Sequence, residues 1–443
     1  MEIRLSDHFT YRKLLRFTFP SIVMMVITSI YGVVDGFFVS NFVGPNAFAA
    51  LNLITPFVMI FSSVGFMLGT GGSALVAKTL GEGEAKKANA IFTMLVFVLF
   101  GLGLIGASFG IVFIRPIASF LGAEGVILEL SIIYGRILFL ALPFFVLQLA
   151  FESFLMVAEL PDLGLKVAIV AGLTNVFLDY LLMGVLGWGI HGAAIATASS
   201  QTLGALIPLF YFLKKNKSRL KITRPSWDGA SLLKASANGS SEMLTTLSLS
   251  SVNMLYNIQL IKLAGPNGVA AYGIIMYMSF LFMSVFIGYS IGSAPIISFH
   301  YGARNYKELK NLFRKSMVLI IGASFLMLGI STGFATPLAR IFVGYDAELL
   351  ALSSRALRLY SISFLFSGIN LFASAFFTAL NNGFISAGLS FLRTLVFQVI
   401  MILFLPRIFG LDGVWFSVVL AEILALIVTI LTFIRHKNRY QYI

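Results

Sequence analysis

The chain has 443 residues, of which 58% are hydrophobic and only 11% are charged, and its mean hydropathy is +0.95. This composition excludes a soluble globular domain, in which about a quarter of the residues are charged, and it indicates an integral membrane protein. The absence of cysteine excludes disulfides and thiolate metal sites. The net charge of +13 would suit nucleic-acid binding. In a membrane protein, however, the positions of Lys and Arg first have to be examined for how the helices are oriented in the membrane.

Apolar segments long enough to cross a bilayer recur along the whole chain. A span needs about 20 predominantly apolar residues, and twelve such segments are separated by turn sequences or polar loops. In chain order they are residues 14–40, 48–77, 90–114, 131–158, 163–183, 189–213, 232–262, 268–300, 313–335, 353–380, 385–406 and 412–434. We therefore predict an all-α integral membrane protein with twelve transmembrane helices.

The lysines and arginines predict how these helices are oriented. If the N-terminus lies inside the cell, the cytoplasmic segments hold most of the 31 basic residues, as the positive-inside rule requires. We therefore expect a multi-pass protein of the cell (inner or plasma) membrane with both termini in the cytoplasm. The basic charge is then explained by topology, and we expect no nucleic-acid partner.

The second half of the chain repeats the first at an offset of 221 residues, the separation of Gly44 from Gly265. The turn sequence Gly-Pro-Asn occurs at 44–46 and again at 265–267. Each unit contains six spans, an even number, so both units enter the membrane in the same direction. We predict two six-helix lobes related by a pseudo-two-fold axis along the membrane normal, with a cavity between them.

This repeat divides the chain into an N-lobe, a cytoplasmic linker and a C-lobe. The expected boundaries are residues 1–213 for the N-lobe, 214–231 for the linker and 232–443 for the C-lobe. Two such lobes around a cavity are typical of transporters, in which one lobe rocks against the other to alternate access.

The repeat also separates residues that the fold needs from residues that only one lobe carries. At the 221-residue offset, Asp35 corresponds to Tyr256, Asn175 to Val396, Asp179 to Ile400, and Thr197 to Val418. The polar residues of the first lobe are thus replaced by apolar or aromatic ones in the second. Because the same helices form without them, the fold does not require this polar group.

The four N-lobe residues are predicted to share the outer half of the membrane. They lie roughly 7 to 13 Å from the outer ends of their helices, at about 1.5 Å per residue. Carboxylates beside an amide and a hydroxyl can exchange a proton or hold a small hard cation through oxygen ligands. We therefore predict a cation or proton site at Asp35, Asn175, Asp179 and Thr197. The alternative is a polar cluster that only orients the helices.

A second set of residues is a candidate for the substrate cleft. Glu152 lies in the fourth predicted span, where it could receive a cationic substrate or relay protons, and Met254, Tyr256 and Asn257 follow one another in the seventh. A satisfied interhelical carboxylate is an equally good interpretation of Glu152. The 16 methionines and 44 phenylalanines would suit a pocket that accepts many drug shapes.

Three other charged residues within predicted spans have structural interpretations. Glu242 opens the seventh span, where the N-terminus of a helix favours a carboxylate. Arg393 and Glu422 lie in the last two spans, and we expect an ion pair between them or between Arg393 and Glu152.

Enzymatic and nucleotide-driven functions find no support in the sequence. The stretch GSALVAKT at 72–79 is one residue short of a phosphate-binding loop, has Ala77 where glycine is required, and ends a membrane span. No nucleophile, base and oxyanion grouping is present, and the four histidines are scattered. We therefore expect no enzyme, no metal site and no cofactor.

Three stretches resemble the multidrug and toxic compound extrusion (MATE) family. They are NVFLD at 175–179, GWGIHGAAIATASSQ at 187–201 and SIYGVVDGFFVSNFVGPNAFAA at 29–50. The resemblance covers essentially the whole chain, including the duplicated six-span lobes. It implies cation-driven efflux of amphipathic, often cationic organic compounds through a central cleft.

The resemblance also implies roles for individual residues. Asp35, Asn175, Asp179 and Thr197 match the N-lobe cation site of the DinF-like and MepA-like branches, and Pro20 matches the proline at which the first span bends. The sodium-coupled NorM-like branch carries acidic residues in its seventh and tenth spans, whereas those spans here offer asparagines.

These expectations combine into a secondary active multidrug exporter. It would exchange amphipathic or cationic drugs for H⁺ or Na⁺, work as a monomer in membrane lipid, and confer antibiotic resistance. The alternative is a lipid-linked oligosaccharide flippase of the same superfamily, which would need a strongly cationic cavity for a pyrophosphate. Only Arg393 is clearly placed within the membrane to serve such a cavity.

Overall fold

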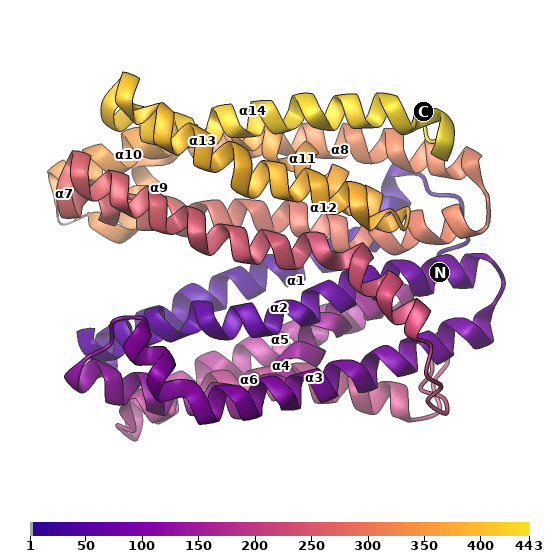
Figure 1. Ribbon diagram of the computed structural model, residues 1–443, viewed down its shortest axis with the longest axis horizontal. Helices are drawn as coiled ribbons and strands as arrows, with labels where there is room; N and C mark the ends of the chain where they lie inside the picture. The colour runs from indigo at the N-terminus through magenta and orange to yellow at the C-terminus, as the bar shows by residue number, and fades with distance from the viewer. Residues whose placement is uncertain (1–2, 345) are drawn as a thin grey trace.

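The computed structural model of the protein describes residues 3–344 and 346–443. Over this part of the chain it consists of α-helices, three short π-helical segments and their connections. Figure 1 shows two bundles of roughly parallel helices side by side, one built from α1 to α6 and the other from α7 to α14. The two-lobed all-α fold predicted from the sequence is confirmed.

The N-lobe helices follow one another with short connections. They are α1 (Tyr11–Phe38), the π-helical segment η1 (Val39–Val43), α2 (Pro45–Gly81), α3 (Ala85–Phe120), α4 (Gly125–Val157), α5 (Pro161–Asp179), the π-helical segment η2 (Tyr180–Val185) and α6 (Gly189–Leu213). The predicted turn between the first two helices lies at Gly44, whose φ of 111° suits glycine, and Pro45 begins the next helix.

The C-lobe helices repeat this order with more interruptions. They are α7 (Gly229–Gly302), α8 (Tyr306–Gly333), α9 (Ala335–Val343), α10 (Ala347–Ser361), α11 (Phe364–Ala379), α12 (Gly383–Phe391), the π-helical segment η3 (Leu392–Val396), α13 (Phe397–Phe404) and α14 (Pro406–Tyr440). The long helix α7 is broken at Gly265, where φ is 60° and ψ is −152°, immediately before Pro266. The division of the chain at 213/214 and 231/232 stays a prediction.

The number of membrane spans agrees with the sequence. Ten helices of the described residues are long and apolar enough to cross a membrane, and the pair α10 and α11, bent by 50°, makes an eleventh. The break at Gly265 divides α7 into two segments of spanning length, so the twelve predicted spans are all present. Most helices extend beyond the predicted bounds, as α3 does from 85 to 120, because helices continue past the apolar region that hydropathy detects.

The lobes touch at the end of the molecule that carries both termini, which we call the terminal end (Figure 1). A Cβ atom on Gly81 of α2 would collide with the backbone of Phe299, and one on Gly302 would collide with the backbone of Lys78. The second contact is the first one moved by the 221-residue offset. The pseudo-two-fold axis is therefore visible in the packing, and glycine permits the close approach of the two helices.

The N-terminal segment ties the two lobes together at the terminal end. Leu5 and Phe9 are both fully buried. The N–H of Leu5 donates a hydrogen bond to Glu159, between α4 and α5, at 2.7 Å. The N–H of Phe9 donates to Glu308, on α8, at 2.9 Å. A polar segment that looked unremarkable in sequence thus bridges the N-lobe and the C-lobe.

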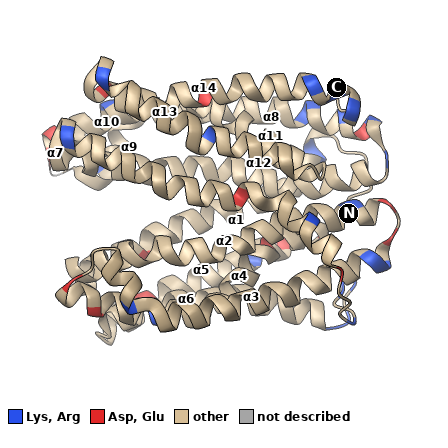
Figure 2. Ribbon diagram, viewed as in Figure 1, with Lys and Arg blue, Asp and Glu red and all other residues tan. Residues whose placement is uncertain are grey.

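The charged residues are distributed as the sequence predicted for a membrane protein. Figure 2 shows that Lys and Arg gather at the terminal end, whereas the middle of both bundles holds few charges. Those few include Asp35 and Asp179 in the N-lobe and Arg393 and Glu422 in the C-lobe. Their surroundings differ between the lobes.

Candidate functional site

Two aspartates meet inside the N-lobe. Asp179 is the last residue of α5 and is fully buried, and Asp35 comes from the neighbouring helix α1. Their carboxyl groups are close enough for each to feel the other's charge. Two ionised carboxylates only accept hydrogen bonds, so a direct bond between them requires a proton. A cation between them is the other way to hold the pair together.

The oxygens of this pair have no other partners. Both carboxylate oxygens of Asp179 and Oδ1 of Asp35 are buried without a hydrogen-bond partner, as is Oδ1 of Asn175 one turn earlier on α5. None of the ion pairs in the described part of the chain includes either aspartate. Buried polar groups in proteins are almost always satisfied, so these oxygens mark a place that a ligand would complete.

Thr197 and two unpredicted residues complete the cluster. Tyr134, on α4, lies near Thr197 on α6, Thr55 on α2 and both aspartates, although the buried Thr55 hydroxyl has no hydrogen-bond partner. The Thr197 hydroxyl donates to the carbonyl of Ala193 at 3.1 Å, which leaves its oxygen free to accept. The structure therefore brings together the four residues predicted as the cation site and adds Tyr134 and Thr55.

Sequence reasoning missed Tyr134 and Thr55, although a signal was present for Thr55. At the 221-residue offset they correspond to Arg355 and Met276. Thr55 is thus replaced by an apolar residue, much as the four predicted residues are replaced by apolar or aromatic ones, whereas Tyr134 is replaced by a charged one. Applying the comparison to every polar residue of the first lobe, and not only to the charged ones and their neighbours, would have found Thr55, but not Tyr134.

Irregular helix flanks the two aspartates. The π-helical segment η2 begins at Tyr180, directly after Asp179, and η1 begins at Val39, one turn after Asp35. Such segments are rare and often occur at functional sites, because the wider turn is less stable than a regular one. The helices next to the aspartates are therefore locally weakened, at the place where a bound ion could change their packing.

The arrangement can hold a proton or a small hard cation. Carboxylate, amide and hydroxyl oxygens from α1, α2, α4, α5 and α6 converge, and such oxygens are the ligands that hard cations prefer. An uncompensated charge inside a membrane costs roughly 3 kcal/mol or more, so two adjacent ionised aspartates would be strongly unfavourable. A cation or a proton removes much of that cost.

The C-lobe holds a polar cluster of a different kind. The Nε of Arg393 lies 2.9 Å from one carboxylate oxygen of Glu422 and 3.2 Å from the other. The amide of Asn370 donates to Glu422 at 2.8 Å and accepts from the hydroxyl of Thr429 at 3.0 Å. The predicted ion pair of Arg393 is confirmed, with Glu422 as its partner in place of Glu152.

The candidate cleft residues do not gather in one place. Tyr256 is buried in the C-lobe, where its hydroxyl donates to Gln398 at 2.9 Å and its ring stacks on Tyr272. Met254 and Asn257 are exposed on α7, and their place in a cleft stays a prediction. A tyrosine in this environment stabilises the lobe from within, so we do not carry it forward as a cleft residue.

Glu152 remains a candidate residue for binding a cationic substrate or relaying protons. It lies on α4, is almost fully buried, and forms no ion pair within the described residues. Its charge acts on Tyr31 of α1, and no hydrogen bond of its carboxyl group is found among the described residues. This carboxyl is therefore buried in the N-lobe without a compensating charge.

The structure corrects the interpretation of Glu242. The seventh span begins at Gly229, with Asp228 as the N-cap that accepts a hydrogen bond from the N–H of Ser231. Glu242 thus lies several turns inside the helix, where the charge of the helix end no longer acts. Its nearest charged neighbour is Arg393. The predicted span already began at residue 232, so the interpretation of Glu242 as the residue that opens it was wrong.

Pro20 lies inside α1, which continues through it from Tyr11 to Phe38. Proline cannot donate the hydrogen bond that would otherwise reach the carbonyl of Arg16. The first span therefore has a built-in weak point on the terminal side of Asp35.

Comparisons with known proteins agree with this architecture. The MatE family model matches twice, over residues 20–181 and 243–404, once in each lobe. Multidrug export protein MepA of Staphylococcus aureus is 24% identical over 428 residues, which cover 95% of this chain and 93% of the relative. A protein of the same name from Staphylococcus saprophyticus is 23% identical over 418 residues, covering 93% and 91%.

Solved structures match the fold over its full length. A MATE transporter in complex with MaL6 superposes with a TM-score of 0.92 at 24% identity, covering 98% of each chain. The outward-facing conformation of a multidrug resistance MATE family transporter of the MOP superfamily gives the same TM-score, identity and coverage. At this identity the likeness establishes the fold, and the chemistry has to be argued from the residues of this chain.

Proposed function

Because the chain belongs to the MatE family, we propose that it is a secondary active multidrug exporter. It expels amphipathic or cationic organic compounds from the cell in exchange for H⁺ or Na⁺. The names of the relatives, multidrug export proteins that match over nearly their whole length, support this class of substrate. No cofactor takes part in such transport, because the ion gradient supplies the free energy.

The coupling ion binds in the N-lobe, at Asp35 and Asp179. One observation carries this assignment: the buried oxygens of these aspartates and of Asn175 have no partner, whereas Arg393 and Glu422 in the C-lobe pair with each other. The hydroxyls of Thr55, Tyr134 and Thr197 supply further oxygen atoms. Both H⁺ and Na⁺ suit this set, and the experiment below separates them.

The terminal end faces the cytoplasm, in the cell (inner or plasma) membrane. The concentration of Lys and Arg at that end supports this orientation (Figure 2). The close contact of Gly81 with Phe299 and of Gly302 with Lys78 then lies on the cytoplasmic side. In this conformation the protein is closed to the cytoplasm, as an exporter is when it releases its substrate outside.

Ion binding acts on substrate release through α1. Neutralising Asp35 and Asp179 removes the repulsion between α1 and α5 and lets these helices pack more closely. Pro20 and the π-helical segments allow α1 to change shape at small cost. The rearranged α1 weakens the hold on the substrate in the outward-open state, so ion entry drives drug release.

A lipid-linked oligosaccharide flippase is the alternative within the same superfamily. Such a protein needs unpaired cations in its cavity to hold a pyrophosphate. Arg393, the basic residue expected within the membrane, is neutralised by Glu422, which favours the exporter. Translocation of a pyrophosphate-linked lipid by the purified protein, without drug efflux, would reverse this preference.

Transport in reconstituted vesicles tests the proposal. A fluorescent cationic drug is loaded, and either a proton gradient or a sodium gradient is imposed in the absence of the other. We expect one of the two gradients to drive efflux by the wild type, and neither to drive it in Asp35→Asn or Asp179→Asn. Asp162→Asn, the same change at an exposed position in the first turn of α5, is the matched control and should transport normally. Normal gradient-driven efflux by both site variants would overturn the assignment.

A further inference from the structure

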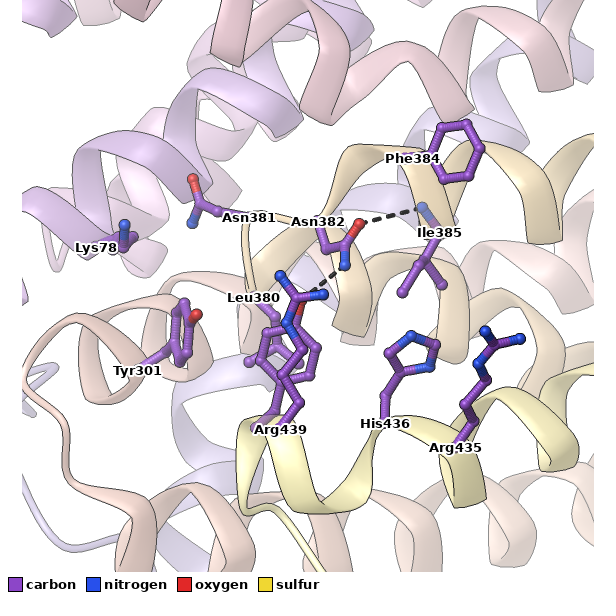
Figure 3. A pocket seen from close by; sticks show the side chains of 11 residues that line it. Lys78, Tyr301, Leu380, Asn381, Asn382, Phe384, Ile385, Arg435, His436 and Arg439 are labelled. Atoms are coloured by element: carbon purple, nitrogen blue, oxygen red, sulfur yellow. Dashed lines mark hydrogen bonds between the residues drawn. The ribbon is translucent and has the colours of Figure 1, made fainter.

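A basic pocket opens at the terminal end of the C-lobe, between α2 of the N-lobe and the C-lobe helices α12 and α14 (Figure 3). It encloses about 520 Å³. Its lining includes Lys78, Arg435 and Arg439 together with Asn381, Asn382 and His436. No acidic side chain is among the described residues that line it, so the pocket is positively charged.

The charges of this pocket are largely uncompensated. Arg435 and Arg439 form no ion pair within the described residues, whereas Lys78 lies 3.3 Å from Glu82. The pocket also faces the N-terminus of α12, where Asn382 accepts a hydrogen bond from the N–H of Ile385 at 3.3 Å. Helix N-termini carry partial positive charge and favour anions. The chemistry that fits is therefore a phosphate or a similar anion.

The position of the pocket favours a lipid over a soluble anion. On α14, the residues Ile427, Leu431 and Arg435 follow one another at intervals of four and form a stripe along the helix, with Arg439 one turn farther on. The first two are exposed apolar residues, which in a membrane protein face lipid. The two arginines therefore stand where the same lipid-facing stripe reaches the headgroups.

The first turn of α12 adds an exposed aromatic side chain to the lining of the pocket. Phe384 lines the pocket and is 91% exposed (Figure 3). An exposed phenylalanine beside two arginines matches the boundary between acyl chains and headgroups, where aromatic and basic residues are both enriched. A soluble anion would have no use for this apolar wall.

We propose that this pocket binds the phosphate of an anionic phospholipid, with the acyl chains lying along the exposed faces of α12 and α14. Arg435, Arg439 and the first turn of α12 hold the phosphate. Lys78, which belongs to the N-lobe, reaches the same pocket from across the lobe boundary, next to the close contact of Gly302 with its backbone. A bound lipid therefore joins the two lobes and stabilises the conformation that is closed at the terminal end.

Lipid binding is measured on the full-length protein by native mass spectrometry and by thermal unfolding in detergent. The probe is phosphatidylglycerol, compared with phosphatidylcholine of the same chains and with inorganic phosphate. The test variant is Arg435→Gln/Arg439→Gln, and the matched control is Arg407→Gln/Lys437→Gln, which removes the same charge from the same helix outside the pocket. We expect phosphatidylglycerol to bind the wild type and the control, and to bind the test variant about fivefold more weakly for each arginine removed.

Lys78→Gln is a second test variant, which keeps both arginines and removes the charge that the N-lobe contributes to the pocket. It should bind phosphatidylglycerol more weakly than the wild type, and phosphatidylglycerol should raise its unfolding temperature less. Equal binding of phosphatidylglycerol to wild type and both variants would overturn the proposal. If phosphatidylcholine bound as tightly as phosphatidylglycerol, the pocket would not be a site for anionic lipid. If inorganic phosphate raised the unfolding temperature as much as phosphatidylglycerol does, the pocket would not be a lipid site. These outcomes are independent of drug transport, so they leave the proposed function to its own test.

Discussion

The two lobes each bury a polar cluster inside the membrane, and the two clusters are built in opposite ways. In the N-lobe, Asp35 and Asp179 lie together with no basic residue beside them and with unpartnered oxygens. In the C-lobe, Arg393 and Glu422 neutralise each other and Asn370 satisfies the carboxylate. The first cluster is incomplete without an added positive charge, and the second is complete in itself.

Neither cluster is required by the repeated fold. At the 221-residue offset, the C-lobe residues Arg393, Glu422, Asn370 and Thr429 correspond to Gly172, Gln201, Leu149 and Pro208 in the N-lobe. Each lobe thus carries its own polar cluster on the same arrangement of helices. The difference in partners, and not the mere presence of polar residues, distinguishes a binding site from a structural network.

The strongest test of this comparison makes the N-lobe resemble the C-lobe. Asn175→Val/Asp179→Ile introduces the residues that occupy the equivalent positions, Val396 and Ile400. We expect drug efflux to fall to background and thermal stability to rise, because each unsatisfied buried polar group costs about 1–3 kcal/mol. Efflux in vesicles and unfolding temperature in detergent measure the two effects. Retained efflux, or a loss of stability comparable to the loss of function, would contradict the account.

The next test breaks the complete cluster. Arg393→Met leaves Glu422 buried and unpaired, and breaking a buried pair costs about 3–5 kcal/mol. Arg393→Met/Glu422→Leu removes both charges and should recover most of that loss. Thermal unfolding of the two variants measures the difference. If the single and double variants were equally destabilised, the pair would not be the structural element that its geometry indicates.

A third test opens the contact between the lobes at the terminal end and leaves both polar clusters unchanged. Gly81→Leu places a side chain against the backbone of Phe299 and should push the lobes apart. The chain has no cysteine, so Ser21→Cys, at a buried position that hydrogen-bonds across the lobes to Gly288, serves directly as a reporter. We expect labelling of this cysteine to become about tenfold faster, a population shift of ~1.4 kcal/mol.

Gly322→Leu is the control for that experiment, because no atom lies near the position of its Cβ. It should leave the labelling rate of the reporter unchanged. Equal rates in Gly81→Leu and Gly322→Leu would show that the glycine contact does not hold the terminal end closed.

The smallest expected effect comes from the hydroxyl that sequence reasoning missed. Tyr134→Phe removes one group from the N-lobe cluster and should weaken binding of the coupling ion about fivefold, the effect of one hydrogen bond worth ~1 kcal/mol. Tyr289→Phe removes a buried hydroxyl that donates to Ser316 in the C-lobe. It should lower stability without changing ion affinity. The dependence of drug efflux on ion concentration gives the ion affinity of each variant. Equal affinities of Tyr134→Phe and Tyr289→Phe would show that the Tyr134 hydroxyl does not contribute to ion binding.

The spans, the two lobes and the ion pair of Arg393 could be predicted from the sequence for physical reasons. Twenty-residue apolar segments must become helices in lipid, because their backbone groups have no other partners. The duplication then supplied the arrangement of the lobes. Arg393 needed a partner inside the membrane, and few carboxylates were within reach of its helix.

The remaining features depend on packing that no local pattern records. The π-helical segments after Asp35 and Asp179 have no local signature in the sequence, and Tyr134 joins the site only because α4 packs against α2 and α6. The start of the seventh span was predicted at residue 232, close to Gly229, but Glu242 was wrongly interpreted as a helix-end carboxylate although it lies ten residues farther along. The basic pocket forms between α2, α12 and α14, whose proximity the sequence alone does not state.

The central claim is that Asp35 and Asp179 bind the coupling ion, and ion release on substrate binding tests it most directly. The purified protein is mixed with a cationic drug in weakly buffered solution, and released protons and sodium ions are counted together. We predict that the wild type and Asp162→Asn release one of the two ions, and that Asp35→Asn/Asp179→Asn binds the drug but releases neither. Ion release by the double variant equal to that of the wild type would contradict the claim.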